Sequence, residues 1–187
     1  MSIDISQSTH HLITSAVDAV RNNYAGVQAT INAETTTDPY ECPSLLPENV
    51  ATTSWPNPPG GGISWVGFMA ITQTEQPALA LTVSRTVYQL RAICGVRSSS
   101  LRAGGAGGTV DDPDLTGQDA GWHAGSLMSS CVATVLVRHM TDYKGIYSAV
   151  LKGITALPGS TFAGNDTFGY QVDLDIHMMT YNAALTT

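Results

Sequence analysis

The chain has 187 residues, of which 43% are hydrophobic and only 12% are charged. Lysine and arginine total 8 against 15 aspartate and glutamate, for a formal net charge of −7, so the chain lacks the basic surface through which proteins bind nucleic acid or anionic membranes. The apolar content argues against disorder, the length suits one domain over residues 1–187, and the low charged fraction indicates surface that is covered in an assembly.

The N-terminal residues Met1 to Asp4 lack a basic start that leads into an apolar stretch, so we expect no signal peptide. No run in the chain approaches the ~20 apolar residues that cross a bilayer. These features predict a soluble protein that is made and kept in a cytoplasm.

Residues 8–24 have the spacing of an amphipathic helix. The apolar positions that recur every three or four residues are Leu12, Ile13, Ala16, Val17, Val20 and Tyr24. Gly26 follows this pattern at the place where a helix commonly ends. The sequence therefore predicts an N-terminal helix that stops near Gly26.

Residues 34–62 contain six prolines and the triplet Gly60-Gly61-Gly62. Proline removes a backbone donor and fixes φ, so we expect a long irregular loop here. Trp55 in its middle is the expected anchor of the loop, either on a partner or on the protein's own body, with self-packing as the default.

Residues 63–72 are apolar at nearly every position and predict a strand. We expect a turn at Glu75 to Pro77 and then a long strand, or two strands, over residues 78–96. In the second half of that segment apolar and polar residues alternate, which is typical of an antiparallel strand with one face in solvent.

Residues 97–125 are rich in glycine and aspartate and predict a second long loop. Residues 126–140 then carry apolar residues at helical spacing, and Ser126 can cap a helix. The β-branched residues between Val132 and Val137 would suit a strand instead, so the state of residues 131–137 is open, with a helix favoured.

Residues 146–152 and 168–178 predict a closing pair of strands. In the second of them apolar side chains alternate with polar ones without a break. The polar, solvent-facing positions are Gln171, Asp173, Asp175 and His177. The resulting fold class is α+β, a mostly antiparallel β-sheet packed by the N-terminal helix and one further helix, with long irregular loops.

No motif in the sequence combines a nucleophile, a base and an orienting group, so we expect no enzyme and no cofactor. Asp173, Asp175 and His177 share a strand face at intervals of ~7 Å, which would allow a metal only on a curved strand with a further ligand. We favour a solvated acidic stripe. The three cysteines Cys42, Cys94 and Cys131 are expected as buried free thiols, although one disulfide plus a free thiol stays open.

The order of these elements, and the rhythm of Phe162-Ala163-Gly164 followed by Phe168-Gly169-Tyr170 and the alternating strand, resembles tail-terminator and neck (head–tail connector) proteins of tailed bacteriophages. The resemblance implies a homohexameric ring that caps the tail tube and joins it to the connector, in a virion assembled in the host cytoplasm. It also implies that the stripe from Gln171 to His177 lines a channel through which DNA passes without specific binding. The family has no catalytic residues to carry over.

Two other classes of function stay open. A capsid decoration protein or another virion structural protein would share the same assembly-prone composition. A small hydrolase or ligand-binding domain would instead use a pocket between the sheet and the helices.

Overall fold

Two helices and five strands form the part of the chain that the computed structural model describes, namely residues 9–34, 41–52, 64–80, 83–97, 117–157 and 167–181. The helices are α1 (Thr9–Glu34) and α2 (Gly117–His139), and two short 3-10 turns, η2 and η4, span Pro47–Asn49 and Met140–Asp142. The strands are β1 (Val50–Ala51), β2 (Ser64–Ala80), β3 (Val83–Arg97), β4 (Ile146–Leu157) and β5 (Thr167–Tyr181). The predicted α+β class is confirmed.

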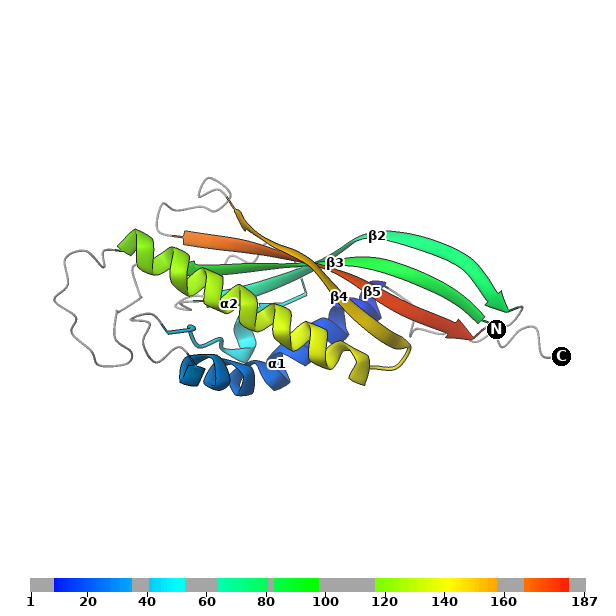
Figure 1. Ribbon diagram of the computed structural model, residues 1–187, viewed down its shortest axis with the longest axis horizontal. Coiled ribbons are helices and arrows are strands. Elements are labelled where there is room, and N and C mark those ends of the chain that lie inside the picture. Colours follow the sequence, from blue (N-terminus) through cyan, green and yellow to red (C-terminus); the bar gives the residue numbers. More distant parts are fainter. Residues whose placement is uncertain are drawn as a thin grey trace.

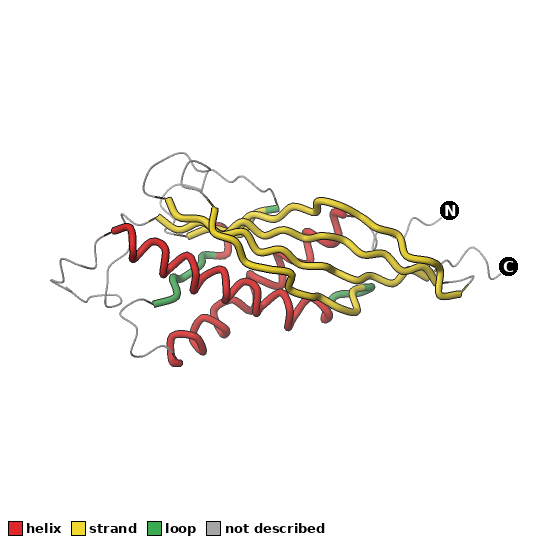
Figure 2. Tube along the Cα trace, turned by 45° about the horizontal axis from the view of Figure 1, so that its top comes forward, coloured by secondary structure: helices red, strands yellow, loops and turns green. Residues whose placement is uncertain are grey.

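The five strands make one sheet in the order β1-β2-β3-β5-β4, and every pairing is antiparallel except that of β1 with β2. Figure 2 shows the strands as one long curved layer. The predicted pairing of the two closing strands is confirmed, because β4 and β5 are antiparallel neighbours. Among the described strands β4 has β5 as its one neighbour, so it is an edge strand of this sheet.

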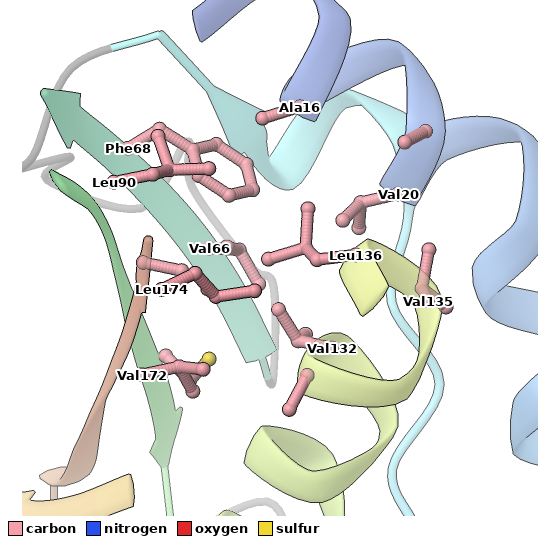
Figure 3. Close-up of a cluster of buried hydrophobic side chains, with 14 of the residues drawn as sticks. Ala16, Val20, Val66, Phe68, Leu90, Val132, Val135, Leu136, Val172 and Leu174 are labelled. Carbon is pink, nitrogen blue, oxygen red and sulfur yellow. The ribbon is translucent and has the colours of Figure 1, made fainter. Parts of the chain in front are cut away.

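Both helices lie on the same face of the sheet (Figure 1). Side chains from the two helices and from β2, β3 and β5 meet between the layers in one buried cluster (Figure 3). The labelled members are Ala16, Val20, Val66, Phe68, Leu90, Val132, Val135, Leu136, Val172 and Leu174. Neither described helix has the length and apolar character that would carry it across a membrane.

Helix α1 does not end near Gly26 as predicted but runs eight residues further, to Glu34. The apolar stripe continues beyond the glycine, because Val27 is buried and Ile31 packs against the core. Burial of these side chains outweighs the modest cost of a glycine inside a helix. The same periodicity explains α2, in which residues 131–137 are helical and Cys131, Val132 and Val135 are buried.

The turn predicted at Glu75 to Pro77 is wrong, because β2 continues to Ala80. The register of β2 against β3 shifts between Gln76 and Ala80, so Pro77 lies in an irregular part of the ladder. The short strand β1 covers β2 only at Val66 and Gly67. Proline is tolerated at such an edge, because no second strand needs its missing N–H.

The two predicted loops are shorter than expected. Within residues 34–62 the chain forms η2 and β1, and of residues 97–125 those from Gly117 onward belong to α2. Gly121 inside α2 allows close packing, since a Cβ there would overlap the Phe168 ring. Trp55, the expected anchor of the first loop, lies outside the described residues.

Candidate functional site

Strand β5 presents one buried and one solvent-facing side, as the sequence predicted. Val172, Leu174, Ile176 and Met178 are buried against the helices. The four polar residues between them, Gln171, Asp173, Asp175 and His177, are each partly exposed. The two-sided character of the strand is therefore confirmed, whereas its role as a channel wall stays a prediction.

Asp173 is held from two sides on this face. The register places Arg91 of β3 directly opposite it, and Arg91 Nε donates to Asp173 Oδ1 at 2.8 Å. The other carboxylate oxygen accepts a hydrogen bond of 2.6 Å from Gln171 Nε2 on the same strand. Both oxygens are thus occupied by neighbours within the sheet.

The next two polar residues of β5 have cationic partners as well. Lys152 Nζ of β4 lies 3.3 Å from Asp175 Oδ2, and Arg85 Nη2 of β3 lies 3.3 Å from His177 Nδ1. The His177 ring also packs 5.7 Å from the ring of Tyr147, over which the Arg85 guanidinium lies at 5.2 Å. A cation from a neighbouring strand therefore accompanies each of the three ionisable residues of the stripe.

The expectation of an acidic sheet face is consequently wrong. Asp173 and Asp175 contribute two negative charges, and Arg91, Lys152 and Arg85 contribute three positive charges beside them. The sequence could not reveal this balance, because it depends on which residues of β3 and β4 the register sets opposite β5. No three His, Cys, Asp or Glu side chains in the described ranges converge in a way that could hold a metal ion.

The three cysteines are free and buried, which confirms the favoured prediction. They approach one another around Tyr24 of α1, whose hydroxyl donates to the Pro43 carbonyl at 2.8 Å and lies 3.4 Å from Cys42 Sγ. Burial is the main cause that raises the pKa of the Cys94 thiol far above its usual range. A neutral buried thiol is a poor nucleophile, so Cys94 is a packing residue.

A surface feature that sequence reasoning missed is a groove of about 530 Å³ between α2 and β4, which we call the α2–β4 groove. Its aliphatic lining includes Val137 of α2 and Val150, Leu151 and Ile154 of β4, each between 37% and 45% exposed. Arg138 also lines it. The sequence signal for this groove is the aliphatic residues on both faces of residues 146–154. This pattern does not indicate whether the strand lies at the edge or in the middle of the sheet.

The α2–β4 groove borders the open side of β4. Beyond its pairing with β5, this strand leaves backbone N–H and C=O groups at the sheet margin, which is a template for association with another chain. One lysine, Lys152, and irregularities in the ladder near residues 147 and 152 interrupt the edge. An aliphatic groove beside an edge strand is a surface that a partner can cover.

No protein-family model matches the sequence, and no curated protein shows significant similarity to it.

Proposed function

We propose that this protein is a non-enzymatic structural component of a tailed-bacteriophage virion that assembles with copies of itself into a ring at the head–tail neck or at the tail end. The observation that carries the proposal is the α2–β4 groove, where four large aliphatic side chains stand exposed beside an edge strand. Subunits of permanent assemblies characteristically leave such apolar surface to be buried by a neighbour. The proposed hexamer and its contacts with tail-tube and connector proteins come from the resemblance in the order of elements.

The polar face of β5 suits a surface past which DNA moves without sticking. Arg91 and Lys152, which could otherwise bind phosphate, are each paired with a carboxylate of the same sheet. Phosphate binding depends on cations that are available to replace counterions, so Arg91 and Lys152 should bind DNA weakly. The third cation of the face, Arg85, lies against His177 and Tyr147. The net charge of −7 adds a general repulsion.

A second candidate function is the binding of a small apolar ligand in the α2–β4 groove. Its volume of about 530 Å³ falls within the range of small-molecule pockets. The groove lies at a sheet edge, where backbone N–H and C=O groups of β4 can form hydrogen bonds. A protein partner can supply the matching groups, whereas a small apolar ligand cannot, so we favour a protein partner.

The mass of the purified protein in solution tests the main proposal. Mass photometry and light scattering coupled to gel filtration should find an assembly, of about 118 kDa if six chains of 19.7 kDa form the ring. Negative-stain images should then show rings with a central opening. A particle that remains at 19.7 kDa over the whole concentration range would overturn the proposal.

A further inference from the structure

Each edge of the sheet has a helix beneath it, but the space between helix and edge strand differs at the two edges. At one edge α1 packs under β2 and β1, and at the other edge α2 packs under β5 and β4 (Figure 1). A helix beneath an edge strand leaves a space between helix and strand. Other residues of the chain can fill this space, or it stays open as a groove. In the described part of the chain, residues 41–51 fill the space at the β1 edge, whereas the space at the β4 edge is open as the α2–β4 groove.

Residues 41–51 form the seal at the β1 edge. Cys42, Asn49 and Val50 are buried there, and Asn49 Nδ2 donates to the Ser64 carbonyl at 3.0 Å. Arg21 of α1 fixes the segment from below, because its Nε donates to the Pro47 carbonyl at 3.0 Å and its Nη2 to the Val50 carbonyl at 2.8 Å. The segment is thus held to the body of the protein by side chains from both layers.

The outer surface of this seal presents an apolar side chain next to a carboxylate. Leu46 is half exposed, and Pro47 and Glu48 beside it are exposed as well. Among the residues that the structure describes, five large hydrophobic side chains are exposed; four of them line the α2–β4 groove, and Leu46 is the fifth. The exposed aliphatic surface is therefore divided between the two opposite flanks of the sheet.

The charged side chains next to the two exposed aliphatic surfaces differ in sign, while Arg21 at the β1 flank is engaged with the Pro47 and Val50 carbonyls. Glu48 lies beside Leu46, and Glu41 at the start of the same segment is also exposed. Arg138 lines the α2–β4 groove and is exposed there. An apolar projection beside carboxylates matches an apolar groove beside a cation.

We propose that Leu46 and Pro47 of one copy insert into the α2–β4 groove of the next copy, with Glu48 facing Arg138. This contact rests on the proposed function, since it names the partner that covers the groove. It joins two different surfaces of the same chain, so it is heterologous, and repeating it gives a closed ring when the rotation between copies closes. Groove-to-groove pairing around a two-fold axis is disfavoured, because it would bring Arg138 of both copies onto one interface.

Covalent trapping tests the contact in the full-length protein. The double variant Leu46→Cys/Ile154→Cys, treated with a short bis-maleimide, should give a ladder of covalent oligomers. Each single cysteine variant should give none, because the three native cysteines are buried. A covalent dimer from Ile154→Cys alone would show groove-to-groove contact and overturn the proposal.

Substitutions of the contact provide an independent measurement. Leu46→Glu and Ile154→Glu should each weaken self-association at least about tenfold in mass photometry. The matched control Thr30→Glu, which adds the same charge at an exposed position of α1, should leave it within about twofold. Circular dichroism and urea unfolding confirm that each variant is folded.

A charge exchange examines the polar part of the contact. Glu48→Arg and Arg138→Glu should each weaken association, and the two together should restore it to within about threefold of the wild type. A wild-type protein that assembles while Leu46→Glu assembles equally well, or while the double cysteine variant gives no ladder, would overturn this interface and leave the ring intact. A wild-type protein that stays monomeric would overturn both.

Discussion

Arg91 and Asp173 lie directly opposite each other on β3 and β5, with Arg91 Nε 2.8 Å from Asp173 Oδ1. Each side chain is about one third exposed, 32% and 33%, so water screens the pair. We therefore expect a small coupling energy of about 0.5–1 kcal/mol in a double-mutant cycle with Arg91→Met and Asp173→Ala. Urea unfolding of the four proteins measures it, and a coupling above about 2 kcal/mol would mean that the pair is far better shielded from water than its exposure indicates.

Alanine at the glycines that contact aromatic rings should destabilise the protein. A Cβ at Gly121 would overlap the Phe168 ring, and a Cβ at Gly95 would overlap the Trp65 ring. Each variant should lose about 1–3 kcal/mol of unfolding free energy, because a packed ring must move.

The matched control for these variants is Gly26→Ala. A Cβ at Gly26 meets nothing within 4 Å, and the residue lies inside α1. This substitution should raise the unfolding free energy by about 0.5–1 kcal/mol, since alanine is the better helix former. Thermal and urea unfolding of the three variants check the signs; a loss at Gly26 as large as at Gly121 would contradict the explanation from ring contact.

Alkaline pH should weaken the fold through Cys94. Burial raises the pKa of this thiol in the folded protein, whereas an unfolded thiol has a pKa of about 8.5. The stability that this group contributes is complete below about pH 8.5 and is lost as the pH rises, because unfolded chains release a proton that the folded chain keeps. The loss amounts to about 1.4 kcal/mol per pH unit.

Replacement by Cys94→Ala isolates this effect. The variant should be less stable than the wild type at pH 7, because it leaves a small cavity, but its unfolding free energy should fall less steeply above pH 9. Urea titrations between pH 7 and pH 10.5 give both slopes. Parallel slopes would mean that the Cys94 thiol ionises equally in the folded and unfolded chains.

Arg21→Gln should loosen residues 41–51 without unfolding the protein. The variant loses the pair of hydrogen bonds that Arg21 donates to the Pro47 and Val50 carbonyls, so we expect a cost of about 1–3 kcal/mol. Hydrogen exchange should accelerate at residues 46–51 and remain unchanged in β3 and β5. The control Thr30→Ala removes a hydroxyl that bonds only within α1, to the Gly26 carbonyl, and should not affect these amides.

The sequence predicted those elements whose periodicity is set by burial within a single segment. The alternation of β5 and the apolar stripe of α2 each depend on one repeat, and both elements were predicted, although α2 begins at Gly117, nine residues before the predicted start at Ser126. The predicted end of α1 and the predicted start of α2 were wrong, because glycine content favoured a break where burial favours a helix. Gly26 was interpreted as the end of a helix but is tolerated inside α1, and the glycine-rich composition of residues 97–125 favoured a loop where α2 begins at Gly117.

The candidate site was less predictable because it depends on relations between segments. The partners of Asp173 and Asp175, namely Arg91 and Lys152, lie on other strands, and only the register brings them together. The α2–β4 groove depends on β4 being the last strand of the sheet, and no local pattern encodes that position.

One consequence follows from the unequal finish of the two sheet flanks. In the described part of the molecule, residues 41–51 cover the β1 edge and the α2–β4 groove leaves the β4 edge open, so the molecule is polar along this axis. A linear assembly of such molecules ends in an uncovered groove on one side and an uncovered Leu46 surface on the other. Both surfaces are covered in every subunit only when the assembly closes into a ring.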